Sequence, residues 1–526
     1  MRIERVVPAR TGLAGAWARG EAAATPFYPP STDDPGAVRA LARSLGQVWT
    51  GEKRARLAGS LRGGGAESAS RLERFVREGG FVVTTGQQPV LFGGPLYVLY
   101  KALGAIHLAA RWEVLLGRPV LPVFWIASED HDWEEARLAR IIDPANELHE
   151  IRVEDTLEDR HPPLFRRKVG RGLRAAFDAF AVHLPDSEFA PRWERILDEA
   201  ASAGTLPEAF EAVILGLLGD RGLFTLQAHD PGLKEATRDL LVRELDEGAA
   251  SEQALVRRAA EIEGAGFACQ VPILDGALNL FVEGPTGRER LFRGGDPEGG
   301  FVLRRSGAVR SLEEIAAAVR GDPAILSPNV LLRPVVEAAF IPTLAYVAGP
   351  GEAAYLAQSA PLFERHGVHR PLVHLRDGFN LVEAKIEKVL AKLDLTSDAL
   401  SEPFHELAGQ VVREGMPEGI RRALGEARGA LARSAGTLAG EVRALDPTLE
   451  PVARQLQGQG FQQLDEIEKK VVQSLKRENE ITLDQLRKAQ LHLHPGGEPQ
   501  ERAIGPWYHL YRYGAELIDR IATELR

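Results

Sequence analysis

The feature that most constrains the fold of this chain is a series of short apolar runs that alternate with helical stretches. The runs at residues 81–84 and 120–127 are rich in β-branched and aromatic residues and are typical of buried strands. The other predicted strands span 222–227, 278–282, 301–303, 342–347 and 371–375. Strands that alternate with helices predict an α/β fold with a mainly parallel sheet, interrupted by inserted segments.

The pattern changes after residue 376, and no convincing strand is predicted from Asp377 to about Leu493. Leucines recur there every seven residues, the period of a coiled coil: Leu424, Leu431, Leu438 and Leu445. Asp446-Pro447 predicts a break, after which a second polar helix is expected from about 449 to 491. We therefore predict an antiparallel α-helical hairpin of coiled-coil type.

These patterns divide the chain into three predicted parts. Residues 1–376 form the α/β core, 377–495 form the helical hairpin, and 496–526 form a C-terminal segment that returns to the core. The last of these ends in an amphipathic helix, predicted at 507–525.

Composition excludes several classes of protein. The net charge of the 526 residues is -10, which disfavours a general nucleic-acid binder. Cys269 is the single cysteine and cannot form an intramolecular disulfide. No apolar run approaches the roughly 18 residues that span a bilayer, and the first residues carry no secretory pattern. We expect a cytoplasmic protein without nucleic-acid or membrane partners.

Ligands of open α/β sheets bind beyond the carboxyl ends of the strands, so the residues that follow each predicted strand are the candidates for a site. The first junction follows residue 84. Gly86 permits a tight turn, and Gln87 and Gln88 offer neutral donors and acceptors. Pro95 suits the first position of a helix, whose free N–H groups attract anions, and Lys101 adds charge. A plain strand–turn–helix with polar turn residues is the alternative.

The second junction is Glu129-Asp130-His131-Asp132, directly after an apolar strand. If the backbone stays extended, Glu129 and His131 share one side and the two aspartates share the other. A carboxylate beside an imidazole raises the pKa of the ring and suits a general base. The same carboxylates could bind Mg²⁺. The alternative is a polar loop in which Asp132 caps the next helix.

The third junction is the Gly349-Pro350-Gly351-Glu352 turn after the strand at 342–347. Upstream, the two prolines of 327–334 predict a shaped loop that carries Asn329 and Arg333. Arg333 could bind a carboxylate or phosphate, or form a structural salt bridge.

Together these junctions resemble one protein family. TGQQ with GGPLYVLYK at 85–101, PVFWIASEDHDWEE at 122–135, SPNVLLRP at 327–334, AGPGEAAY at 348–355 and QER at 500–502 are similar to the cysteine-adding enzymes of bacillithiol biosynthesis, the BshC family. Departures occur at Ala348, Glu337 and Gly93, where the family tends to have Gly, Gln and Thr.

The resemblance implies a Rossmann-like core and a helical coiled-coil domain through which a homodimer forms. It also implies a ligase that joins the carboxyl group of L-cysteine to the amino group of glucosaminyl-malate. ATP or ADP with Mg²⁺ is the candidate cofactor for activating the carboxyl group, and no resident metal is predicted.

On this basis we hypothesise roles for the junction residues. His131 is the base, Glu129 or Asp132 orients it, and Asp130 binds a hydroxyl or Mg²⁺. Gln87, Gln88 and the helix start near Pro95 hold the malate carboxylates or a phosphate. Lys101 and Arg333 supply positive charge for an anionic substrate or a developing oxyanion. The other expected substrate-binding residues are Thr85, Gly86, Tyr97, Trp125, Asn329, Gly349 and Glu352. Two rival functions stay open: a metal-dependent hydrolase or deacylase that uses Glu129–Asp132, and a non-catalytic dimeric scaffold.

Overall fold

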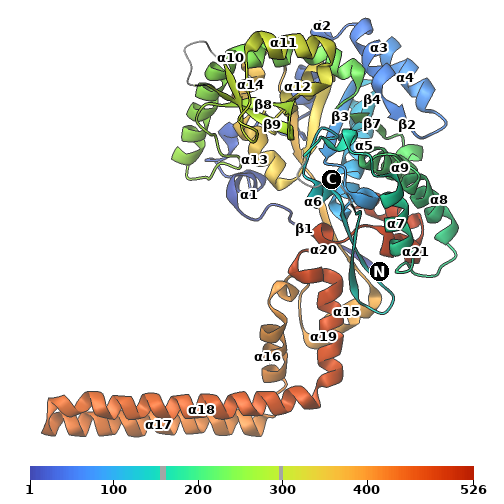
Figure 1. The fold of residues 1–526 in the computed structure, drawn as a ribbon. Helices are drawn as coiled ribbons and strands as arrows, with labels where there is room; N and C mark the ends of the chain where they lie inside the picture. Colours follow the sequence, from blue (N-terminus) through green and yellow to red (C-terminus); the bar gives the residue numbers. More distant parts are fainter. Residues whose placement is uncertain (155–160, 295–299) are drawn as a thin grey trace. The chain divides into compact units, whose positions relative to one another are not determined.

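The computed structural model describes residues 1–154, 161–294 and 300–526 (Figure 1). It divides into two compact units. The α/β unit comprises Ile3–Asn380 and Glu501–Arg526, and the helical unit comprises Met1–Arg2 and Leu381–Gln500. The divisions thus fall after Asn380 and Gln500. The sequence predicted them after residues 376 and 495.

The centre of the α/β unit is a six-stranded sheet in the order β14-β13-β3-β4-β7-β2. Its strands are β2 (Arg62–Gly63), β3 (Phe81–Gln87), β4 (Val120–Ile126), β7 (Phe224–Gln227), β13 (Thr343–Ala348) and β14 (Leu372–Leu375). All neighbours pair in parallel except β2, which runs antiparallel to β7. The predicted Rossmann-like, mainly parallel sheet is therefore confirmed.

The apolar runs form central strands because both of their faces are covered. In β3, Phe81 and Val83 pack with Trp112 of α5 (Leu96–Leu116), whereas Val82 faces the opposite way. That second face packs against α3 (Gly51–Ser60) and α4 (Ser68–Arg77). Successive side chains of a strand point to opposite faces, so a strand buried on both sides is apolar throughout.

A second sheet is antiparallel, with the order β11-β10-β9-β8-β12. Its strands are β8 (Ala277–Gly284), β9 (Gly287–Arg293), β10 (Phe301–Leu303), β11 (Val309–Arg310) and β12 (Leu326–Pro328). The predicted strands at 278–282 and 301–303 belong here and not to the parallel sheet. The reason is local, because a tight turn between Gly284 and Gly287 folds β9 directly back on β8. Of the loop expected at 327–334, Ser327 and Pro328 belong to the edge strand β12 and Arg333 begins a helix.

Two-stranded sheets pair β5 (Leu138–Ile142) with β6 (Leu148–Arg152) and β1 (Arg2–Val6) with β15 (Gly378–Val382). The strand β15 corrects the prediction that strands end before residue 377. The other long helices are α1 (Gly12–Ala18), α2 (Pro35–Val48), α7 (Gly170–Ala181), α8 (Ala190–Ala201), α9 (Leu206–Leu218), α10 (Pro231–Gly264), α11 (Leu312–Gly321), α12 (Arg333–Phe340) and α13 (Pro350–Gln358). Shorter ones are α6 (Trp133–Ala136), α14 (Ala360–Arg365) and α20 (Gln500–Ala503).

The helix predicted at 507–525 is two helices, α21 (Trp507–Tyr513) and α22 (Glu516–Thr523). They separate at Gly514, whose φ of 67° and ψ of −166° form a backbone conformation that glycine adopts far more readily than other residues.

The helical unit contains α15 (Ala384–Leu393), α16 (Phe404–Glu414), α17 (Glu418–Leu445), α18 (Glu450–Glu478) and α19 (Glu480–Leu493). The helices α17 and α18 run side by side and antiparallel (Figure 1), which confirms the coiled-coil hairpin. Arg428 joins them through ion pairs of 2.6 Å to Asp465 and to Glu468. The second helix, predicted as continuous to 491, is interrupted at Asn479.

The leucine heptad is only partly buried within the hairpin. Leu431 packs directly against Gly460 of α18. A Cβ added to this glycine would lie 2.5 Å from Cδ2 of Leu431. Further along α17, Leu438 and Leu445 are 42% and 83% exposed. The heptad therefore leaves an apolar stripe on the surface of this unit.

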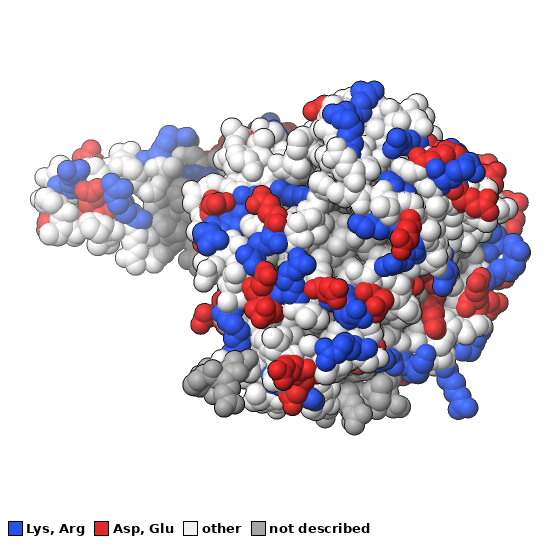
Figure 2. Space-filling model, turned by 90° about the horizontal axis from the view of Figure 1, so that it is seen from above, with Lys and Arg blue, Asp and Glu red and all other residues white. Residues whose placement is uncertain are grey.

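Charged side chains of both signs are mixed over the face shown in Figure 2, without a broad area of one sign. This agrees with the modest net charge of the chain. Within the three described ranges, no helix is long and apolar enough to cross a bilayer.

Candidate active site

A cavity of about 540 Å³ opens at the carboxyl ends of β3, β4 and β13. Parallel strands place their following loops at one edge of the sheet, so the three junctions singled out in the sequence share this cavity. The predicted site residues that line it are Gly86, Gln87, Gln88, Tyr97, Lys101, Trp125, Glu129, Asp130, His131, Asn329, Arg333, Gly349 and Glu352. Thr85, Pro95 and Asp132 do not line it.

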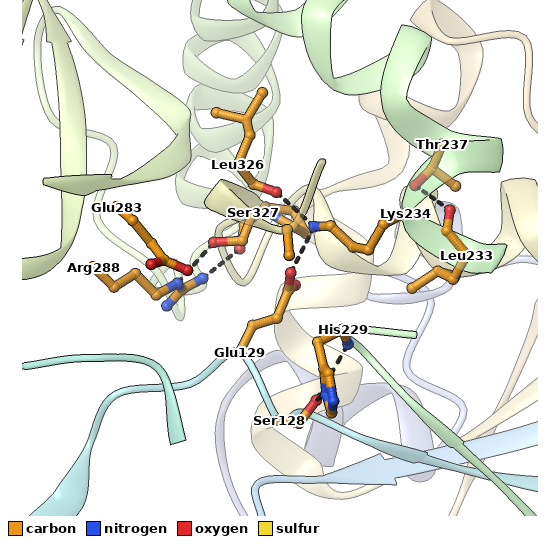
Figure 3. Close-up of polar contacts among 12 residues, drawn as sticks. Ser128, Glu129, His229, Leu233, Lys234, Thr237, Glu283, Arg288, Leu326 and Ser327 are labelled. Atoms are coloured by element: carbon orange, nitrogen blue, oxygen red, sulfur yellow. Dashed lines mark hydrogen bonds and ion pairs between the residues drawn. The ribbon is translucent and has the colours of Figure 1, made fainter. Parts of the chain in front are cut away.

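The acidic segment after β4 turns instead of continuing as a strand. The Asp130 N–H donates to the Ala127 carbonyl at 3.0 Å, which closes a turn and separates the carboxylates. Glu129 points to the buried Lys234 of α10, with 2.6 Å between Oε1 and Nζ (Figure 3). Asp132 caps α6 by accepting the Glu135 N–H. Neither residue is placed to orient His131, contrary to the hypothesis from the sequence.

His131 lies between a carboxylate and a guanidinium group. The Asp130 Oδ1 is 3.7 Å from His131 Nδ1, and an Arg288 Nη1 is 3.3 Å from the same nitrogen. Since a guanidinium only donates, Nδ1 accepts and the proton of the neutral ring lies on Nε2. Burial and then the charge of Arg288 lower the pKa of His131 from 6.5 to about 4. The raised pKa expected beside a carboxylate is therefore wrong, because burial and the cation outweigh Asp130.

Arg288 itself is buried and held by neutral groups. Its Nε donates to Ser327 Oγ and its Nη2 to the Pro328 carbonyl, both at 2.8 Å. The guanidinium also covers the Phe281 ring at 4.0 Å. Figure 3 shows Arg288 and Ser327 close to the Glu129–Lys234 pair.

Lys101 and Arg333 are already paired inside the protein. Lys101 Nζ is 2.6 Å from Glu352 Oε2, whose oxygen also accepts the Gly349 N–H at 2.7 Å. Arg333 is 2.5 Å from Glu337 and donates to the Tyr355 hydroxyl at 2.9 Å. Burial lowers the pKa of Lys101. We expected both cations to face an anionic ligand, but each forms a salt bridge within the protein. For Arg333 this is the alternative stated in the sequence analysis.

At the start of α5, one of the N–H groups expected to attract an anion is taken by the protein itself. Pro95 precedes the helix as its cap, and the Leu96 N–H donates to the Ile504 carbonyl of the C-terminal segment at 2.9 Å. Thr85 is taken up within the sheet, where its hydroxyl donates to the Val347 carbonyl. A tertiary contact thus takes up the Leu96 N–H, one of the donors that a helix start leaves free.

Gly86 lies in a tightly packed part of the cavity wall. A Cβ at this position would lie 3.0 Å from the Trp125 carbonyl oxygen and 3.1 Å from the Tyr346 hydroxyl. A larger residue here would have to displace Trp125 or Tyr346 by a few tenths of an ångström.

Several cavity residues were not predicted from the sequence. Arg288 and Arg290 alternate along β9, Arg376 follows β14, and Arg502 comes from the C-terminal segment. Arg376 forms a bidentate pair with Glu501 at 2.6 and 2.9 Å. Arg376 could have been found from the sequence because it follows a predicted strand, and Arg502 because it belongs to the QER motif. Arg288 and Arg290 gave no such signal, since they lie in a strand outside the parallel sheet.

Three of these arginines have no carboxylate counter-ion. Among the described residues, no Asp or Glu oxygen lies within 4.0 Å of a guanidinium nitrogen of Arg288, Arg290 or Arg502, whereas Arg376, Arg333 and Lys101 are all paired. A half-enclosed cavity that holds unneutralised guanidinium groups is suited to an anionic ligand, and in particular to carboxylates.

The segment Glu129–Asp132 does not assemble a metal site by itself. Within the described ranges, the one cluster of three His, Cys, Asp or Glu ligand atoms within 4.8 Å of one another lies elsewhere, at Asp143, His149 and His183.

Comparison with known proteins covers almost the whole chain. Residues 39–377 match the family model for the N-terminal Rossmann-like domain of bacillithiol biosynthesis BshC, and residues 379–526 match that for its C-terminal coiled-coil domain. A protein of Salinibacter ruber is 33% identical over 87% of this chain and 83% of its own length. One of Heliobacterium modesticaldum is 30% identical over 99% of this chain and 97% of its own. Both carry the name "Putative cysteine ligase BshC".

Proposed function

Because this chain belongs to the BshC family of bacillithiol biosynthesis, we propose that it is a ligase that joins the carboxyl group of L-cysteine to the amino group of glucosaminyl-malate. The product would be bacillithiol, which makes this the last step of the pathway. The observation that carries the proposal is the cavity at the carboxyl edge of the sheet, where three arginines have no carboxylate counter-ion among the described residues.

The arginines match the most distinctive part of the proposed substrate. A malyl group carries two carboxylates, and guanidinium groups bind carboxylates through two parallel hydrogen bonds. We assign this role to Arg288, Arg290 and Arg502. Gln87 and Gln88, which also line the cavity, are suited to the neutral hydroxyls of the sugar.

The reacting ammonium group must lose one proton before it attacks an acyl group, and it loses a second as the amide forms. The pKa of His131, about 4, and its contact with Arg288 make the ring a poor proton acceptor. Glu135 also lines the cavity, and partial desolvation followed by the charge of Asp132 raises its pKa. We assign proton acceptance to Glu135 in place of His131, and propose that His131 donates its Nε2–H to the substrate.

Amide formation in water also needs an activated carboxyl group, and ATP with Mg²⁺ is the co-substrate that we propose for this purpose. Two helix starts at the sheet edge do not fit its phosphates as they stand. At α13 the Gly349 N–H already donates to the Glu352 carboxylate, and at α5 the Leu96 N–H already donates to the Ile504 carbonyl. We therefore assign the nucleotide no residue and no step.

An omission assay tests the reaction. Purified protein is incubated with L-cysteine, glucosaminyl-malate and ATP-Mg²⁺, each component is left out in turn, and the thiol product is measured by mass spectrometry. We expect product only when L-cysteine, glucosaminyl-malate and ATP-Mg²⁺ are all present. A folded protein that yields no product from the complete mixture would contradict the proposal.

We further propose that a second copy of this chain covers the exposed stripe of the hairpin and gives a homodimer. Large apolar side chains near the end of the hairpin remain exposed: Leu438, Leu445, Leu449, Val452 and Leu456. Apolar side chains with seven-residue spacing on a helix surface are typical of a coiled-coil interface.

A further inference from the structure

We propose that Asp143, His149 and His183 form a binding site for one divalent transition-metal ion, with Zn²⁺ as the ion that their chemistry favours. The three residues belong to the α/β unit and none of them lines the cavity described above. Asp143 directly follows β5, His149 lies in β6, and His183 follows α7. Their ligand atoms all lie within 4.8 Å of one another.

The Asp143 carboxylate is held in place by the turn that joins β5 to β6. Its Oδ1 accepts the Glu147 N–H at 2.9 Å, and its own N–H donates to the Glu147 carbonyl at 3.0 Å. The other oxygen, Oδ2, lies 3.0 Å from His149 Nε2. One carboxylate oxygen thus fixes the side chain while the other faces the histidines, which is how a preformed ligand is supported by its surroundings.

The two histidines lie face to face. Their ring centroids are 3.7 Å apart and the rings are inclined by 18°. Among the residues described in the structure, neither ring nitrogen of His183 has a hydrogen-bond partner, and His149 has one only at Nε2. All three residues are half-buried, so solvent ions reach them while two imidazoles remain available as ligands.

Two imidazole nitrogens and one carboxylate oxygen are the ligand types that Zn²⁺ takes when water completes its coordination. The lone pairs of stacked rings run nearly parallel, so one ring has to rotate for both nitrogens to face one ion. His183 can do this because it lies beyond Ala181, the last residue of α7. The bound ion would then link the β5–β6 hairpin to the end of that helix.

Metal binding to the purified full chain tests this inference without any activity assay. The protein is stripped with a chelator, titrated with ZnCl₂ by calorimetry, and examined with Co²⁺, whose visible absorption reports tetrahedral nitrogen and oxygen ligands. We expect one equivalent of Zn²⁺ to bind and the melting temperature to rise on addition of the metal.

Substitutions then locate the ion. We expect His183→Gln to weaken Zn²⁺ binding by at least about tenfold and to abolish the Co²⁺ spectrum. Asp143→Asn keeps the oxygen that accepts the Glu147 N–H and should weaken binding in the same way without disturbing the turn. The matched control is His405→Ala, because His405 is an exposed histidine of the helical unit and should bind as the parent does.

Absence of a stoichiometric site in the folded parent protein would overturn the inference. Equal binding by the parent and by both substituted proteins would also overturn it, since the ion would then lie elsewhere.

Discussion

Glu129 and Lys234 form an ion pair of 2.6 Å although 105 residues separate them, and their side chains are only 7% and 2% exposed. Lys234 Nζ also donates to the Leu326 carbonyl at 2.5 Å. The pair therefore joins the end of β4, the long helix α10 and the edge strand β12 beside the cavity (Figure 3). Glu129, the first acidic residue of the Glu129–Asp132 segment, therefore has a structural partner in Lys234.

Lys234→Met should destabilise the α/β unit strongly. The substitution leaves the Glu129 carboxylate buried without a counter-ion, which typically costs about 3–5 kcal/mol. The double variant Glu129→Gln/Lys234→Met should recover part of that loss because no uncompensated charge remains. Urea unfolding followed by tryptophan fluorescence measures both. Arg238→Met is the control on the same helix, since its exposed pair with Glu235 should contribute less than about 1 kcal/mol.

Arg502→Gln should raise the KM for glucosaminyl-malate by about tenfold or more and leave the KM for L-cysteine nearly unchanged. The reason is the loss of one charge-assisted contact to a carboxylate, which is worth about 1.5–3 kcal/mol. Steady-state kinetics with each substrate varied in turn provides the measurement, and Arg502→Lys should recover part of the affinity. Arg140→Gln, on the exposed β5–β6 hairpin, should behave as the parent. A uniform loss for both substrates would argue against the assigned role.

Acid should destabilise the fold partly through His131. Burial and Arg288 lower the pKa of His131 from 6.5 to about 4, so the folded state favours the neutral ring. A lowered folded pKa contributes stability that is fully present above pH 6.5 and is lost as the pH falls towards 4. We expect the melting temperature to fall over this window, and to fall less in His131→Gln. An identical pH dependence in the two proteins would show that the ring is not the titrating group.

Leu445→Glu combined with Leu456→Glu should convert a dimer into a monomer. Both leucines are exposed on the hairpin of one chain, so charge there should leave the fold intact while it disrupts an apolar interface. Light scattering coupled to size-exclusion chromatography measures the mass, and circular dichroism checks the helix content. Val114→Glu, at an exposed valine of α5, is the control. A parent protein that is monomeric at micromolar concentration would remove the proposed interface.

The strands at the centre of the fold could be predicted because their signal is local. The run around Trp125 is apolar at every position, and a strand needs that pattern only when helices cover both of its faces. The strand at 278–282 was also found, but its assignment to the parallel sheet was wrong. Which sheet a strand joins depends on the chain that follows it, and here the turn before Gly287 sends that chain straight back.

The amino-acid sequence by itself determined which segments become strands and helices, and which polar residues follow the strands at one edge of the sheet. It also carried the motifs by which the family is identified. Only the tertiary structure decided which charges are left for a ligand. Lys101 and Arg333 are paired within the cavity wall, whereas Arg288 and Arg502 have no carboxylate partner in the part of the chain that the structure describes. The reason is physical: a charged side chain is neutralised by whatever partner lies within a few ångströms, and folding brings that partner from a distant part of the chain.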